Sequence, residues 1–108
     1  MAHYLVQASY TTQAIGDLVK HPQNRAAAGR PIVERLGGKI ESHYFAFGEH
    51  DVVTIIEMPD NVTMASFSMA LGASGAFSSF KTTVLIPMDE AVEAMRKAGT
   101  VGYRPPGG

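Results

Sequence analysis

The spacing of apolar residues changes between two periods along the chain, and these changes predict the order of its strands and helices. Alternation of apolar and polar residues is typical of a strand, and a repeat of about 3.6 residues is typical of a helix. Apolar, β-favouring residues predict four strands, at residues 4–10, 39–47, 52–56 and 77–86. Helical spacing predicts helices at residues 13–20 and 23–36, from Asp60 to Leu71, and from Asp89 to Ala98. The predicted order is β-α-β-β-α-β followed by a further helix.

Polar caps and a proline set the expected ends of the helices. Thr11 or Thr12 can cap the first helix, and Asp60 can cap the helix that follows the third strand. Pro31 lacks an amide proton and its ring clashes with the preceding turn. We therefore expect the stretch before the second strand to break or kink near Gly29.

The last predicted helix is amphipathic and leads into a short tail. Asp89 is expected to cap it, and Glu93 and Lys97 have the spacing of a favourable ion pair. Residues 99–108 contain four glycines and two prolines, which predicts irregular structure. The expected organisation is one domain over residues 1–98 and an irregular tail over residues 99–108. The residues expected to turn inward on this helix are Ala91, Val92 and Met95.

This order of elements is that of a ferredoxin-like α+β fold, in which two helices cover one face of a four-stranded antiparallel sheet. The strands offer apolar residues on both faces, because Val53 and Ile55 alternate with Val52 and Ile56. Large exposed apolar patches are rare on monomers, so we expect the uncovered face to be buried between two copies of the chain. The face assigned to that contact includes Phe45, Val52 and Thr54.

Composition narrows the possible partners. The chain has 108 residues, of which 45% are apolar and 18% are charged, and its net charge is −1. This balance argues against nucleic acid or an anionic membrane as a partner. The absence of cysteine excludes disulfides, thiolate metal sites and a cysteine nucleophile. The sequence shows neither a signal peptide pattern nor an apolar run long enough for a membrane span, so we expect a cytoplasmic protein.

A set of residues spread from about residue 3 to residue 90 is informative through its order and spacing. Its members are Tyr10, Thr11, Gln13, Gly16, Arg25, Gly37, Gly38, Tyr44, Gly48, Asp51, Glu57, Pro59, Asp60 and Thr82. In this set the chain resembles the GYD-domain family. The resemblance implies a ferredoxin-like, dimeric α/β-barrel protein of bacterial or archaeal type, for which the family offers no assigned activity. One departure is at the signature, where His50 stands in Gly48-Glu49-His50-Asp51 in place of the family's tyrosine.

Titratable side chains are concentrated around the turn at residues 48–51. His43 and His50 flank this turn, Glu49 and Asp51 add carboxylates, and we assign both histidines to the uncovered face of the sheet. Imidazole beside carboxylate suits acid–base chemistry or a borderline divalent metal. Since the sequence contains neither His-x-His nor His-x-x-x-His, we predict no metal and no cofactor. Asp51 has a structural alternative, because its carboxylate can accept hydrogen bonds from turn amides.

Three further side chains complete the candidate ligand site. Arg25 can bind an anion or pair with Glu57, and Tyr10 and Tyr44 can orient a ligand through their phenols. No catalytic residue is identified. The predicted ligand-binding residues are Tyr10, Arg25, His43, Tyr44, His50 and Asp51.

Two classes of function remain. Neither a Gly-x-Ser-x-Gly elbow nor a phosphate-binding glycine loop is present in a suitable context. The favoured prediction is an oligomeric module, a homodimer or a multiple of dimers, that binds a small apolar or aromatic ligand or serves in assembly. The alternative is a cofactor-independent enzyme, similar to monooxygenases or isomerases of related fold, that uses His43, His50 and tyrosines in the barrel cavity.

Overall fold

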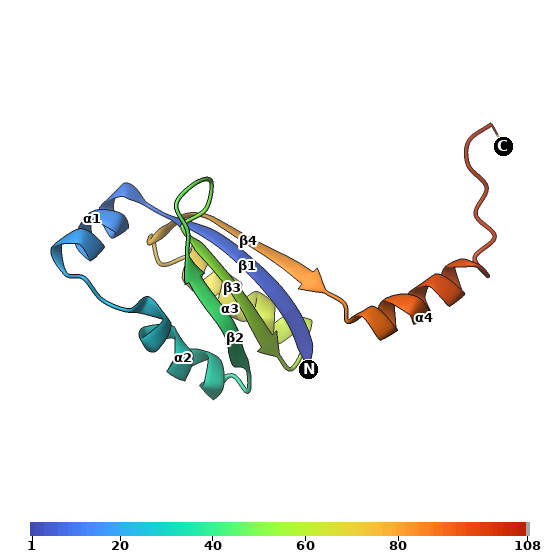
Figure 1. Ribbon diagram of the computed structural model, residues 1–108, viewed down its shortest axis with the longest axis horizontal. Helices are drawn as coiled ribbons and strands as arrows, with labels where there is room; N and C mark the ends of the chain where they lie inside the picture. Colours follow the sequence, from blue (N-terminus) through green and yellow to red (C-terminus); the bar gives the residue numbers. More distant parts are fainter. Residues whose placement is uncertain (108) are drawn as a thin grey trace.

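The computed structural model describes residues 1–107 and gathers the predicted strands into one antiparallel sheet (Figure 1). The strand order is β2-β3-β1-β4, with β1 in the interior between β3 and β4. This is the ferredoxin-like arrangement, so the predicted α+β fold is confirmed. The elements are β1 (Ala2–Tyr10), α1 (Thr12–Lys20), α2 (Arg25–Arg35), β2 (Lys39–Phe45), β3 (Val52–Met58), α3 (Asn61–Gly72), β4 (Phe77–Leu85) and α4 (Met88–Ala98).

The first three helices begin at polar caps. The side chain of Thr11 accepts a hydrogen bond from the Ala14 amide at 3.2 Å, and Asp60 accepts one from the Thr63 amide at 2.8 Å. α2 begins after Asn24 and, contrary to the expected break, runs through Pro31 without interruption. A proline removes only one amide donor from the helix. The turn beyond it is held in place because Val33 is completely buried against the sheet.

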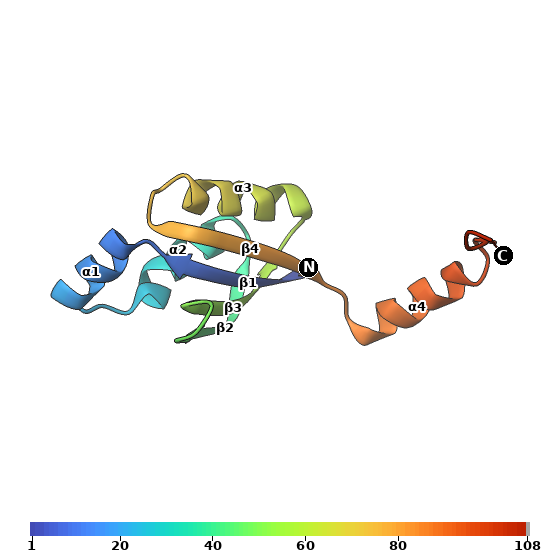
Figure 2. The ribbon, with the colours of Figure 1, turned by 90° about the horizontal axis from the view of Figure 1, so that it is seen from above.

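α2 and α3 cover the same face of the sheet (Figure 2). Their inward side chains meet those of β1 and β3 in a single core, which is where most of the apolar burial of the chain occurs. The other face carries no helix in the described part of the chain (Figure 2). The core residues are Tyr4, Val6, Val33, Ile56, Met58, Met64 and Phe67.

The helix-covered face of β3 is the opposite of the one predicted. Val52 and Thr54 are 7% and 4% exposed, and they are buried within the chain rather than left for a second copy. The open face instead carries Val53 and Ile55, which are half-buried. Both phases of this strand are apolar, so alternation alone could not show which one faces the helices.

A bulge in β2 changes the phase of the strand that follows it. Ile40 pairs with Ile56 and Ser42 pairs with Ile55, so Glu41 is an extra residue without a partner of its own on β3. The hydroxyl of Thr54 donates a hydrogen bond to the Ser42 carbonyl at 2.6 Å, directly beside the bulge. His43 then lies opposite Thr54 on the helix-covered side. The assignment of His43 to the uncovered face is therefore wrong.

α4 does not pack its apolar residues inward. It projects away from the sheet and the other helices, none of its residues is buried, and Val92 and Met95 are 40% and 63% exposed (Figure 1). Its cap is Pro87 without a side-chain hydrogen bond, and Asp89 lies in the first turn instead of capping the helix. Glu93 pairs with Arg96 at 3.1 Å rather than with Lys97.

The projecting helix makes the chain elongated. The radius of gyration is 17.5 Å, whereas a compact chain of this length has about 13 Å. Beyond α4, residues 101–107 have neither helix nor strand, and the last residue of the predicted tail, Gly108, lies outside the described residues. Within residues 1–107, no helix is both long and apolar enough to cross a bilayer. The cytoplasmic location stays a prediction.

Candidate functional site

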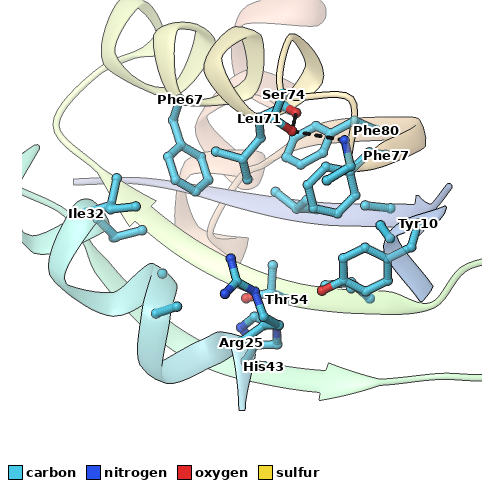
Figure 3. A pocket seen from close by; sticks show the side chains of 18 of the residues that line it. Tyr10, Arg25, Ile32, His43, Thr54, Phe67, Leu71, Ser74, Phe77 and Phe80 are labelled. Carbon is cyan, nitrogen blue, oxygen red and sulfur yellow. Dashed lines mark hydrogen bonds between the residues drawn. The ribbon is translucent and has the colours of Figure 1, made fainter. Parts of the chain in front are cut away.

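A cavity lies between the covered face of the sheet and the helices α1, α2 and α3. Its volume is about 430 Å³, which is within the range of small-molecule pockets. Figure 3 shows aromatic and aliphatic side chains on one side of the cavity and Arg25 and His43 on the other. The cavity therefore has an apolar wall and a polar end.

The apolar wall is built largely from aromatic rings of α3 and β4. Tyr10 stacks on Phe77 with their ring centroids 5.0 Å apart, and Phe77 meets Phe80 edge to face at 5.4 Å. Phe67 and Leu71 of α3 complete this side of the cavity (Figure 3). Such a wall suits the faces and edges of a flat apolar or aromatic ligand.

Phe77 joins this wall because the pairing of β1 with β4 is also irregular. Ala8 pairs with Phe80, but Tyr10 pairs with Phe77 after a register shift at the end of β1. In a regular strand, residues 77 and 80 would point to opposite faces of the sheet. The shift brings both rings to the same cavity, so the pattern of the sequence alone did not identify them as site residues.

Arg25 brings a positive charge to the polar end. It is the first residue of α2, and its Nη1 donates a hydrogen bond to the Gln23 side chain at 2.8 Å. The predicted alternative, an ion pair with Glu57, does not form in the described part of the chain. A guanidinium carries five N–H donors, so most of its donors remain able to bind an acceptor on a ligand.

His43 adds an imidazole nitrogen that has no partner. Its Nδ1 atom is buried without a hydrogen bond among the described residues. Burial, with a smaller effect from the positive charge of Arg30, lowers the pKa of His43. The imidazole is therefore neutral near pH 7, and one of its nitrogens can accept a proton or a hydrogen bond.

Tyr10 lies at the junction of the two sides. Burial raises the pKa of its phenol, the nearby Asp51 carboxylate also raises this pKa, and Arg25 opposes both effects. The phenol therefore stays protonated at neutral pH and can donate a hydrogen bond. Its ring belongs to the aromatic wall, so one residue can contact both the apolar and the polar part of a ligand.

The structure brings only some of the predicted ligand-binding residues together. Tyr10, Arg25 and His43 line the cavity, and Thr54 accompanies them. Tyr44 does not line this cavity. It is 68% exposed and borders an adjoining hollow of the β2 edge, which also includes Arg25 and His43.

His50 and Asp51 lie in the loop between β2 and β3 and do not line the cavity. The Asp51 carboxylate accepts a hydrogen bond from the Tyr10 amide at 2.9 Å, and the Asp51 amide donates one to the Ala8 carbonyl at 2.9 Å. Asp51 therefore has a structural role, but the partner of its carboxylate is an amide of β1 and not a turn amide as predicted. The Nδ1 atom of His50 is buried without a hydrogen bond among the described residues.

Comparison with known proteins identifies a family and two similar folds. A model of the GYD domain matches residues 4–95. The crystal structure of MtbAldR is similar with a TM-score of 0.58 at 17% identity, over 80% of this chain and 53% of that chain. The crystal structure of FFRP-DM1 is similar with a TM-score of 0.51 at 12% identity, over 80% of this chain and 100% of that chain. No curated protein sequence matches the chain.

The coverage and the low sequence identity of the two structural matches limit what can be concluded from them about this chain. This chain spans about half the length of MtbAldR. At 17% and 12% identity, the two structures support the ferredoxin-like fold and nothing about ligand or activity. The chemistry of the cavity must therefore be inferred from its own residues.

Proposed function

This chain belongs to the GYD-domain family, and we propose that it is a binding module whose cavity holds a small apolar or aromatic ligand with an acceptor group at one end. The observation that carries this proposal is the cavity of about 430 Å³, with an aromatic wall facing a polar end. Pockets of this kind combine a mainly apolar lining with a few placed polar groups that fix the orientation of the ligand.

Each side of the cavity contacts a different part of the ligand. The rings of Tyr10, Phe77 and Phe80 contact its apolar body. Arg25 binds a carboxylate or another anionic oxygen group, because a guanidinium presents parallel donors to such groups. The neutral imidazole of His43 adds a hydrogen bond beside it.

A charge-dependent binding assay tests this proposal. 1-Naphthoate and its uncharged amide have the same ring system and differ in the anionic group, so calorimetric titration with both isolates the effect of Arg25. We expect 1-naphthoate to bind more tightly than the amide, and Arg25→Gln to weaken its binding at least about tenfold. Arg35→Gln, in the last turn of the same helix, is the matched control and should bind as the wild type does.

The result that contradicts the proposal is equally defined. If 1-naphthoate does not bind in the titration, and native mass spectrometry finds no small aromatic or aliphatic ligand retained by the protein, the cavity is not a ligand site. If Arg25→Gln and Arg35→Gln bind equally well, the charged end of the cavity has no part in recognition.

The alternative of a cofactor-independent enzyme is supported by one observation, the presence of His43 with a buried, unpartnered Nδ1 inside the cavity. A neutral imidazole in this position can remove a proton from a bound ligand, with the Tyr10 phenol as a donor. His50, the other predicted histidine, lies outside the cavity. Incubation of ligands retained by the protein in heavy water, followed by mass spectrometry, tests for proton exchange. Exchange that His43→Gln abolishes supports an isomerase-like activity, and its absence leaves binding as the function.

We also propose that the chain self-associates through the open face of the sheet, as a homodimer or a multiple of dimers. This face carries the apolar side chains of Leu5, Val53, Ile55 and Leu85, which no helix of the described chain covers. Light scattering of Ile55→Asp should show a smaller species than the wild type, because a charge would be buried in the contact. Val62→Asp, at an exposed position of α3, is the control. A wild-type monomer at micromolar concentration would overturn this proposal.

A further inference from the structure

Three possible metal ligands from three neighbouring strands meet on the face of the sheet that lacks helices. They are His3 of β1, Glu41 of β2 and Glu57 of β3. One ligand atom from each side chain lies within 4.8 Å of the others. The three residues are far apart in the sequence and belong to no ligand spacing motif, so the spacing of residues along the chain does not indicate them as a group.

The pairing of the strands explains how these side chains meet. His3 and Glu57 are directly opposite each other on β1 and β3, so their side chains point to the same face. Glu41 is the extra residue of the β2 bulge, and it follows two residues after Lys39, which pairs with Glu57. A bulge redirects the side chain of the extra residue, and here it directs the carboxylate of Glu41 toward His3.

One distance within the cluster already suits a bound cation. His3 Nδ1 and Glu41 Oε1 are 3.3 Å apart. Two ligands at roughly 2.0–2.1 Å from a tetrahedral zinc ion are about 3.3–3.4 Å apart, so this pair already has the required separation. The side chains of His3 and Glu41 are 29% and 36% exposed, which leaves the site partly shielded from water.

The charges of the cluster also favour a cation. Two carboxylates lie close together, and the imidazole of His3 is the group that neutralises one of them when it is protonated. Lys39 faces Glu57 across the strands but forms no ion pair with it within residues 1–107. A divalent ion can balance both carboxylates and bind the neutral imidazole in the same place.

We propose that His3, Glu41 and Glu57 form a site for a borderline divalent cation of the zinc type, separated from the cavity by the sheet. One imidazole nitrogen and two carboxylate oxygens are ligands that Zn²⁺ accepts, and a fourth position remains for water or an external ligand. Because the ligands come from three strands, the bound ion cross-links β1, β2 and β3 at one end of the sheet. The site is independent of the ligand proposed for the cavity.

Calorimetric titration of Zn²⁺ into the full, untagged chain tests this site. We expect one Zn²⁺ per chain and a higher melting temperature when the ion is bound. His3→Ala and Glu57→Gln should each weaken binding at least about tenfold, because each removes a ligand. His21→Ala and Glu34→Gln, at exposed positions outside the sheet, are the matched controls and should retain wild-type binding.

Glu41→Gln provides a variant that cannot disturb the core, since Glu41 is exposed at a bulge. If His3→Ala or Glu57→Gln fails to fold by circular dichroism, Glu41→Gln alone decides, and loss of Zn²⁺ binding in it supports the site. Absence of Zn²⁺ binding to the wild type overturns the proposal. Binding that persists in the folded ligand variants, or that His21→Ala removes, overturns it as well.

Discussion

The two faces of the sheet are built from similar residues but differ in what covers them. On β3, Ile56 is 2% exposed beneath the helices, while its neighbour Ile55 is half-buried on the open face. The covered face holds the core and the cavity, whereas the open face combines apolar side chains with the His3, Glu41 and Glu57 cluster. The difference teaches that alternation defines two faces but does not say which of them becomes the interior of the chain.

The largest expected difference between the two faces is in the free energy of unfolding of the variants Ile56→Ala and Ile55→Ala. Both changes remove the same atoms from adjacent residues of one strand. We expect Ile56→Ala to lower the free energy of unfolding by about 2–5 kcal/mol, because it leaves a cavity in the core. Ile55→Ala should cost much less when measured by urea denaturation at high dilution. Equal losses under those conditions would mean that the open face is packed within the chain.

A glycine pair tests how tightly the covered side is filled. A Cβ added to Gly38 would collide with the Glu57 carbonyl oxygen and would stand 2.7 Å from the Met58 sulfur. We expect Gly38→Ala to cost about 1–3 kcal/mol in thermal unfolding. Gly16→Ala, in α1, adds a Cβ to open space and should instead stabilise the chain by about 0.5–1 kcal/mol. A neutral Gly38→Ala would show that the backbone of β3 moves easily.

A threonine pair compares a buried hydroxyl with a partly exposed one. Thr54→Val removes the hydrogen bond to the Ser42 carbonyl on the covered face, and we expect a cost of about 1 kcal/mol in the free energy of unfolding. Thr83→Val, on the open face, should change this free energy by less than about 0.5 kcal/mol. If the two substitutions have the same effect in urea denaturation, the hydroxyl of Thr54 does not stabilise the bulge.

The smallest expected effect is a pH dependence that arises on the covered side. Because burial lowers the pKa of His43, the unfolded chain takes up a proton at a higher pH than the folded chain. The resulting stabilisation is complete above the ordinary pKa of about 6.5 and is lost as the pH falls through it toward the folded value. The groups that face His43 are Arg25, Arg30 and Thr54.

Urea denaturation at about pH 7.5 and about pH 5 measures this effect. We expect the wild type to lose more stability between the two values than His43→Gln, which has no imidazole to protonate. An identical loss in both proteins would mean that His43 is as well hydrated in the folded chain as in the unfolded one.

Local patterns predicted much of this fold correctly. The order of strands and helices, the pairing of β2 with β3, and the caps at Thr11 and Asp60 follow from residues close together in the sequence. The match to the GYD domain over residues 4–95 confirms the resemblance that these residues indicated. Features of this kind depend on short-range steric and hydrogen-bonding preferences, which a single sequence records.

What could not be predicted depends on contacts between distant segments. One extra residue in β2 moved His43 into the cavity, and a register shift opposite Tyr10 added Phe77 to the aromatic wall. Neither irregularity has a sequence signal, because no glycine or proline marks it. The projection of α4 was missed for a similar reason: its apolar residues showed an amphipathic helix but not whether any surface of the chain would receive them.

The bulge at Glu41 also affects how this protein can change over generations. Deletion of Glu41 would leave Ile40 opposite Ile56 and Ser42 opposite Ile55, so the pairing of the two strands would become regular without any change in partners. His43 would remain opposite Thr54 on the covered face, while the open face would lose a carboxylate. The extra residue therefore allows the open face to gain or lose a side chain through a change in the length of β2, while the lining of the cavity is inherited unchanged.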